Sequence, residues 1–346
     1  MLCPQECDGE NQSWGEEIEE GLKVLVTGAA GHIGNNVVRA LLESGHSPIP
    51  MVRSDQTALD GLPVEIRRGD LLDPASLSAC VEGVDAVIHA AAYVGLKASE
   101  QDQMERVNIQ GTRGLLNACE KASVARFVHF SSVHALSQTP FEAPLTETNA
   151  LALKPEAHPY DRTKAEAERC VLEAAEQGLS VAIVSPTAVL GPHDFKPSRL
   201  GQVLWALYAG KMPALVKSGF DFVDVRDVSM GAVKAMESDC RGERYLLTGK
   251  WHSFRELAES VERVPEARPA PGWDAPVFLA SIGAPFAEFG SWLTGKPPLF
   301  SRGALHMLVH QNPQVDGAKA RERLGYSSRP LEETVEDTLE WWRGNQ

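Results

Sequence analysis

Apolar residues alternate between two spacings along the first half of the chain. Short runs of β-branched and aliphatic residues, such as 22–27 (LKVLVT) and 126–130 (RFVHF), are typical of buried strands. Between such runs, apolar residues recur every three or four positions, as in 33–42, which is typical of amphipathic helices. The same pattern predicts strands at 64–68, 85–89 and 181–185, and helices near 75–82, 103–121 and 160–177. This alternation predicts an α/β fold, a Rossmann-type doubly wound parallel sheet with helices on both faces.

The strand expected after the first helix, 47–52 (SPIPMV), is unusual for a parallel sheet. It contains Pro48 and Pro50. Because proline has no amide hydrogen to donate to a neighbouring strand, we expect this strand to be short or irregular.

Beyond about residue 190 the alternation weakens, and proline and glycine recur. We expect a smaller substrate-facing region there. Its expected pieces are 198–210, 253–263 and 275–293, while 222–225 and 245–247 are expected to add strands back to the main sheet. The chain thus divides into an extension (1–21), a Rossmann domain (22–190) and a mainly substrate-binding region with segments returning to the sheet (191–346).

The net charge of the chain argues against one class of binding partner, nucleic acid. The chain has 47 Asp and Glu against 33 Lys and Arg, a formal net charge of −14. Seven of the acidic residues lie in the first 20 positions, which hold no Lys or Arg, so 1–21 is expected to be a disordered acidic extension. Such a chain is a poor partner for nucleic acid, and we expect a small-molecule substrate instead.

The cysteines do not indicate a metal or disulfide site. The six are scattered, without the paired spacing of a zinc site or of a secreted disulfide framework. Cys3 and Cys7 alone supply too few ligands for a stable site, so no metal is expected. Since no secretory leader opens the sequence, we expect reduced thiols and a cytoplasmic location.

The most apolar late stretch, 277–293, is the one candidate for membrane contact. Gly283, Pro285, Glu288 and Gly290 interrupt it, so it falls short of the roughly 20 continuous apolar residues that a membrane span needs. A buried helix pair is favoured over peripheral association with a membrane surface, which remains the alternative.

A glycine-rich turn follows the first strand directly and opens the first helix: Gly28-Ala29-Ala30-Gly31-His32-Ile33-Gly34. Gly28 permits the tight turn, Gly31 lets the backbone approach a pyrophosphate, and Gly34 allows close helix-to-strand packing. The amides of the helix N-terminus would face the anion. Strand, turn and helix in this order predict a dinucleotide site that includes Ala30, His32 and Ile33.

Arg53 follows the second strand, at the position that usually reads the adenosine ribose. A guanidinium there suits a 2′-phosphate and favours NADP(H), whereas an acidic residue would favour NAD(H). Because Asp55 could also reach the ribose, the sequence leaves NADP(H) and NAD(H) both open.

The turn, TGAAGHIG in 27–34, resembles the TGxxGxxG pattern of the extended short-chain dehydrogenase/reductase family, and the resemblance extends from about residue 22 to 343. It implies an adenine-contacting segment at 69–71, a small-residue strand end at 89–92, a packing helix at 108–112 and a loop over the nicotinamide at 185–187. The cofactor contacts that it implies are Asp70, Leu71, Ala90, Ala91, Ala92, Asn108 and Pro186.

The same resemblance implies a catalytic serine in 130–134 (FSSVH), where the family register selects Ser132 over Ser131, and a YxxxK pair at Tyr160 and Lys164. Residues four apart on a helix share a face, so Tyr160 and Lys164 can point into one cleft. The ammonium of Lys164 would favour the phenolate of Tyr160 and bond the nicotinamide ribose. Ser132 would place the substrate oxygen for hydride transfer.

Four residues beyond the nicotinamide loop have open roles. His193 and Lys196 are candidates for substrate contact, with a solvated loop as the equal alternative. Asp224 and Asp227 are expected to be capping and structural residues rather than catalytic acids.

Within the family, the pattern is most similar to dihydroflavonol-4-reductases and 3β-hydroxysteroid dehydrogenases, and segments of the second half resemble hopanoid-associated sugar epimerases. The leading hypothesis is an NAD(P)-dependent oxidoreductase acting on a ketone or secondary alcohol of a fairly apolar molecule. The alternatives are an NAD-dependent sugar epimerase or dehydratase and a non-catalytic dinucleotide sensor. A homodimer is a further expectation from the family.

Overall fold

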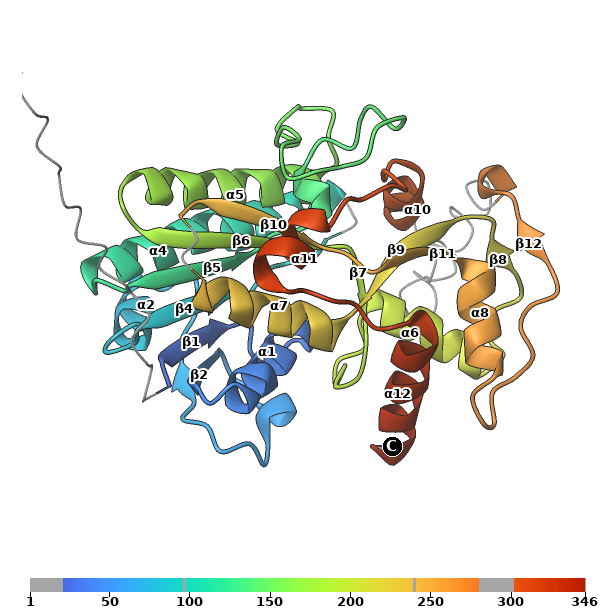
Figure 1. The fold of residues 1–346 in the computed structure, drawn as a ribbon, viewed down its shortest axis with the longest axis horizontal. Coiled ribbons are helices and arrows are strands. Elements are labelled where there is room, and N and C mark those ends of the chain that lie inside the picture. The colour runs from blue at the N-terminus through green and yellow to red at the C-terminus, as the bar shows by residue number, and fades with distance from the viewer. Residues whose placement is uncertain (1–20, 96–97, 239–240, 280–301, 346) are drawn as a thin grey trace, which may run out of the picture.

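The computed structural model describes residues 21–95, 98–238, 241–279 and 302–345. Its centre is a seven-stranded parallel sheet in the order β10-β6-β5-β4-β1-β2-β3 (Figure 1). The strands are β1 (Lys23–Thr27), β2 (Ser47–Val52), β3 (Arg67–Arg68), β4 (Ala86–His89), β5 (Arg126–Phe130), β6 (Ser180–Pro186) and β10 (Glu243–Leu247). The expected α/β fold is therefore confirmed.

Helices cover both faces of this sheet, which buries nearly every apolar residue of its strands. On one face, α1 (His32–Glu43) and α7 (Val225–Glu237) pack side by side with α11 (Ala318–Leu324). On the other face lie α2 (Pro74–Cys80), α4 (Gly111–Lys121) and α5 (Pro159–Glu176). A short α3 (Gln101–Met104) and a π-helical turn, Glu105–Gln110, lead into α4.

The strand β2 is regular over six residues, contrary to the expectation from its prolines. The amide of Ser47 donates to Leu22 O, so alternate amides from Ser47 onward face β1. Pro48 and Pro50 therefore face the opposite side, where β3 begins only opposite Met51. Because no strand needs a donor at the two proline positions, they do not interrupt the sheet.

The second half of the chain builds a smaller body on the carboxyl side of the sheet. It contains α6 (Arg199–Tyr208), α8 (Phe254–Glu262), α10 (Arg302–Val309) and α12 (Leu331–Gly344), which share an apolar core (Figure 1). With them lie a three-stranded sheet, β7 (Ala188–Leu190), β9 (Gly219–Asp224) and β11 (Lys250–Ser253), and a pair, β8 (Leu215–Val216) and β12 (Asp274–Ala275).

One of the two strands expected to return to the main sheet does so. The segment 245–247 lies in β10, which pairs with β6. The segment 222–225 instead falls mainly in β9, which pairs with β7 because β7 leaves the sheet just after Pro186. Within the described residues, no helix is long and apolar enough to cross a membrane. The extension 1–20, Cys240 and most of the apolar stretch 277–293 lie outside those residues.

Candidate active site

The glycine-rich turn brings the start of α1 against the end of β4. Gly28 has a φ of +69°, and a Cβ on it would lie 2.7 Å from the amide nitrogen of Ala91. A Cβ on Gly34 would lie 2.2 Å from the carbonyl oxygen of Gly28. Only glycine fits at either position, because any larger residue would place a Cβ against the backbone. The tight turn therefore depends on both glycines.

The N-terminus of α1 is free to receive an anion. Gly31 at the helix cap makes no side-chain capping bond, and the first turn contains no acidic residue. The first amides of a helix lack intrahelical partners, and their positive dipole end favours phosphate. The residues Gly31, His32 and Ile33 thus fit the pyrophosphate of a dinucleotide.

Below this turn, a buried hydrogen-bond chain fixes the ends of β1 and β4. Thr27 Oγ1 lies 2.7 Å from His89 Nδ1, and His89 Nε2 lies 3.0 Å from Thr112 Oγ1. Burial lowers the pKa of His89 to about 3. A neutral imidazole with two hydrogen-bond partners has a structural role, holding the ends of the two strands together.

The side chain of Asn108 bonds the backbone of Tyr93, which follows the strand end beside the expected cofactor groove. Its side chain accepts from Tyr93 N at 2.7 Å and donates to Tyr93 O at 3.0 Å, just after Ala90, Ala91 and Ala92. It therefore holds the strand end that would border the cofactor. Asp70 has a similar role, because its Oδ1 accepts from Leu72 N at 2.9 Å and shapes the turn after β3.

Ser132 and Tyr160 line one cleft of about 580 Å³, at the carboxyl ends of the central strands. The Ser132 hydroxyl is close enough to the Tyr160 phenol to act on its pKa. Ser131 instead donates to Glu168 at 2.5 Å, in the buried layer beneath α5. The two neighbouring serines are thus separated, with Ser132 facing the cleft and Ser131 facing the core.

Lys164 lies one turn after Tyr160 on α5 and is also buried. Its Nζ donates to the carbonyl oxygen of Phe130 at 2.7 Å. Burial lowers the pKa of Lys164 to about 8, against the opposing charge of Glu168. Burial raises the pKa of Tyr160 to about 12, although the hydroxyl of Ser132 acts in the other direction.

The cleft walls are mainly apolar. Their side chains come from four elements of the second half: Val189, Leu200, Val203, Phe220, Leu305 and Leu308. Polar side chains interrupt this lining, and one pair of them is hydrogen-bonded, with Thr187 Oγ1 donating to Asp221 Oδ1 at 2.6 Å. The other polar residues of the second half that line the cleft are Ser198, Arg199, Gln202, Gln311 and Asn312. Burial raises the pKa of Asp221.

Two features of the sequence point to this polar pair. Thr187 directly follows the residue expected near the nicotinamide, and Asp221 stands between two phenylalanines in an apolar strand. His134 also lines the cleft. Its Nδ1 lies 3.7 Å from Asp161 Oδ1, and burial raises the pKa of Asp161 to about 7.

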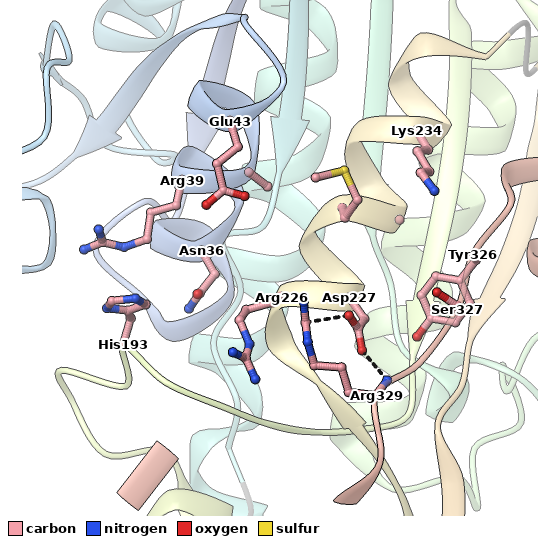
Figure 2. A pocket seen from close by; sticks show the side chains of 13 residues that line it. Asn36, Arg39, Glu43, His193, Arg226, Asp227, Lys234, Tyr326, Ser327 and Arg329 are labelled. Atoms are coloured by element: carbon pink, nitrogen blue, oxygen red, sulfur yellow. Dashed lines mark hydrogen bonds and ion pairs between the residues drawn. The ribbon is translucent and has the colours of Figure 1, made fainter. Parts of the chain in front are cut away.

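The structure does not place His193 and Lys196 in this cleft. His193 lines a separate hollow of about 380 Å³, together with Asn36, Arg39 and Arg226 (Figure 2). Lys196 Nζ lies 2.5 Å from Asp55 Oδ2, beyond the end of β2. The reason is the path of the loop after β7, which α1 holds through its polar side chains: Asn35 donates to His193 O and Asn36 to Pro192 O.

Asp224 and Asp227 have the structural roles that were expected. Asp224 caps α7 and accepts from both the backbone and the side chain of Arg226. Asp227 accepts from Arg329 N at 2.7 Å and from its guanidinium at 2.6 Å, and Figure 2 shows this pair beside the hollow. Within the described residues, no cluster of side chains has the composition of a metal site.

Known proteins match this chain over most of its length. The model of the NAD dependent epimerase/dehydratase family matches residues 24–247. The chain is 35% identical over 328 residues to sterol demethylase protein B of Methylococcus capsulatus, which covers 93% of this chain and 98% of that protein. It is 28% identical over 337 residues to a 4-hydroxy-2-methyl-3-oxo-4-farnesyl-3,4-dihydroquinoline-1-oxide ketoreductase of Stigmatella aurantiaca, covering 92% and 96%.

Among solved structures, a nucleoside-diphosphate-sugar epimerase from Pseudomonas aeruginosa superposes with a TM-score of 0.76. The two chains are 28% identical, and the match covers 94% of this chain and 98% of the other. The resemblance to this family found in the sequence is therefore confirmed. The similar proteins include both a reductase and an epimerase.

Proposed function

Because this chain belongs to the NAD-dependent epimerase/dehydratase family, within the extended short-chain dehydrogenases/reductases, we propose that Ser132, Tyr160 and Lys164 catalyse the interconversion of a secondary alcohol and a ketone. The observation that supports this most directly is the shared cleft. Ser132 and Tyr160 face the same space at the carboxyl ends of the strands, which is where open α/β sheets bind their ligands.

The chain is an NAD(P)-dependent enzyme, and the bound nicotinamide supplies or accepts the hydride. The turn from Gly28 to Gly34 would hold the pyrophosphate, with the first amides of α1 as donors. Ala90, Ala91 and Ala92 and the backbone near Pro186 would border the cofactor. The side chains of Tyr160 and Lys164 would meet its nicotinamide end, and Asp70 and Leu71 its adenine end.

Tyr160 is the residue that would transfer the proton. With a pKa of about 12 its phenol is protonated at neutral pH, so it can donate to the oxygen of a ketone as that oxygen gains negative charge. Ser132 lines the cleft beside Tyr160 and would orient the same substrate oxygen. Lys164, fixed by the Phe130 carbonyl one helical turn after Tyr160, would supply the positive charge that stabilises the phenolate left after transfer.

The cleft supports a fairly apolar substrate with few polar groups. Its volume of about 580 Å³ and its aliphatic and aromatic walls suit a fused-ring or prenylated molecule. The names of two relatives point the same way, since one refers to sterols and the other to a farnesylated quinoline ketone. Thr187 and Asp221 would bond a second polar group of such a substrate.

The test is an activity screen with matched variants. Purified protein is assayed with sterol-like and prenylated ketones and alcohols and with either cofactor, following nicotinamide absorbance. We expect turnover with at least one of these apolar compounds and a loss of about 10³-fold in Tyr160→Phe. A Tyr160→Phe variant as active as the wild type would contradict the proposal.

A sugar epimerase is the second candidate, supported by the structural match to a nucleoside-diphosphate-sugar epimerase. Such an enzyme returns the hydride to the same substrate, so the cofactor is not consumed. Denaturing the purified protein and analysing the released nucleotide separates the two functions. Tightly retained NAD would favour the epimerase, and an empty protein that binds cofactor reversibly would favour the reductase.

A cytoplasmic location and a homodimer complete the proposal. The dimer would form through helices of the main sheet, where α4 and α5 lie side by side on one outer face (Figure 1). Sedimentation of the purified protein tests it, and a monomer at micromolar concentration would remove this part.

A further inference from the structure

Three cationic residues lie in or contact the segment 53–56, which follows the carboxyl end of β2. Arg53 directly follows the strand and is exposed, with no hydrogen bond or ion pair of its side chain to any described residue. Arg68, which ends β3, donates to Ser54 O and, at 2.6 Å, to Gln56 Oε1. Lys196, from the loop after β7, lies 2.5 Å from Asp55 Oδ2.

Asp55 is the acidic residue of this group, and it does not neutralise the group. The Lys196 ammonium and the bonds from Thr57 hold the pKa of Asp55 well below its usual range, so it stays ionised. Arg53, Arg68 and Lys196 against Asp55 leave an excess of two positive charges. A phosphate group, which carries close to two negative charges at neutral pH, would match this excess.

The position of the cluster identifies the phosphate. In a Rossmann-type site the end of the second strand faces the adenosine ribose, where NADP(H) carries a 2′-phosphate and NAD(H) a hydroxyl. We propose that Lys196, together with Arg53, binds the 2′-phosphate of NADP(H), so that the loop after β7 determines cofactor preference. This inference rests on the proposed function, because it assumes that the dinucleotide binds along α1.

The contacts of Lys196 allow it to bind a phosphate without losing Asp55. An ammonium has three N–H donors, and Asp55 occupies one of them. Asp55 has its own support, because its Oδ1 accepts from Thr57 N at 3.0 Å and from Thr57 Oγ1 at 2.8 Å. The Asp55 carboxylate can therefore hold the ammonium at the ribose end of the groove while the other donors face a ligand.

The loop that carries Lys196 is fixed in this position by α1. His32 Nε2 lies 3.1 Å from Gly191 O and 3.2 Å from Pro192 O. Asn36 donates to Pro192 O at 3.1 Å, and Asn35 to His193 O at 3.0 Å. These bonds come from the first turns of the helix that would hold the pyrophosphate, so the loop crosses beside the dinucleotide groove.

The experiment measures dissociation constants for NADPH and NADH by nicotinamide fluorescence in three proteins. They are the wild type, Lys196→Met, and the control Lys217→Met, which removes an exposed lysine between β8 and β9, far from β2 (Figure 1). We expect the wild type to prefer NADPH. In Lys196→Met, NADPH binding should weaken about ten-fold, as for a lost charge-assisted bond, while NADH binding stays within two-fold. The control should match the wild type.

Two fragments isolate the phosphate itself. In the wild type, 2′,5′-ADP should displace NADPH more effectively than 5′-ADP, and Lys196→Met should reduce this difference about ten-fold. Equal losses of NADPH and NADH affinity in Lys196→Met, or no loss of either, would overturn this inference and leave the proposed function intact. A wild type that binds neither dinucleotide would instead overturn the proposed function, and this inference with it.

Discussion

Ser131 and Ser132 show how one register position decides which of two like residues can act. Ser132 shares the cleft with Tyr160, while Ser131 donates to the buried Glu168. Ser132→Ala should therefore lower kcat by 10²-fold or more, because it removes a donor to the reacting oxygen. Ser131→Ala should keep kcat within about three-fold, even if it unfolds at a lower temperature. Steady-state kinetics on both variants test this, and the reverse order of effects would move the catalytic serine to Ser131.

Asp161 gives a residue-scale prediction about stability and pH. Burial raises its pKa to about 7, so the folded state keeps a proton that the unfolded state releases above its ordinary pKa. Its stabilising contribution is full at acid pH and is lost as pH rises through 7. Asp161→Asn should thus exceed the wild type in stability at pH 8 by roughly 1–3 kcal/mol, and by less at pH 5.

Urea unfolding of both proteins at the two pH values measures this difference. Asp60→Asn is the control, because Asp60 is an exposed carboxylate. A constant gap between Asp161→Asn and the wild type across this range would contradict burial as the cause.

For some single residues, the sequence does not predict where the side chain lies. Ser132, Tyr160 and Lys164 could be proposed from their resemblance to family motifs, and only the i, i+4 spacing of Tyr160 and Lys164 had a geometric reason of its own. His193 and Lys196 could not be placed in this way. The path of their loop depends on hydrogen bonds from Asn35 and Asn36 more than 150 residues earlier, and no local pattern encodes them.

At the scale of elements, the sequence predicted where most strands lie but not which strands pair with one another. The apolar runs located β1, β4, β5 and β6 to within a residue or two. The strand β9 reads like a member of the main sheet, yet it pairs with β7 and β11. The prolines of β2 were misleading for a related reason, since their effect depends on which side the neighbouring strand occupies.

The buried carboxylate of Asp224 lies at the start of α7, where Arg226 links this helix to α12. Asp224 caps α7 and bonds Arg226, which also reaches Asp337 on α12 at 2.5 Å. Burial alone would raise the pKa of Asp224, but the bonds from Arg226 outweigh it and lower that pKa. Asp224→Ala would leave a half-buried guanidinium without this partner and remove the cap. It should cost about 3–5 kcal/mol of unfolding free energy.

Chemical denaturation measures this cost, with Asp60→Ala as an exposed control that should change stability by less than about 0.5 kcal/mol. A loss of 1 kcal/mol or less in Asp224→Ala would show that the cap and the ion pair contribute little to joining α7 and α12.

At the scale of the whole molecule, the sheet and the second-half body meet over the start of α1. The loop after β7 contacts α1 and Asp55 on one side. On the other side it continues into Ser198, which caps α6, and α6 forms a wall of the cleft that Ser132 and Tyr160 line. A dinucleotide bound along α1 would therefore stabilise the same segment that shapes the cleft.

Hydrogen exchange tests this coupling between the two parts. Adding NADPH should slow amide exchange in 191–199 and in the first turn of α6 by about ten-fold or more, because bound ligand opposes local opening. The pair β8 and β12 lies on the outer side of the second-half body and should exchange as before (Figure 1). If the 2′-phosphate is what the loop binds, NADH at the same occupancy should protect 191–199 less than NADPH does. Protection confined to the glycine turn and β4 would show that the loop stands outside the cofactor site.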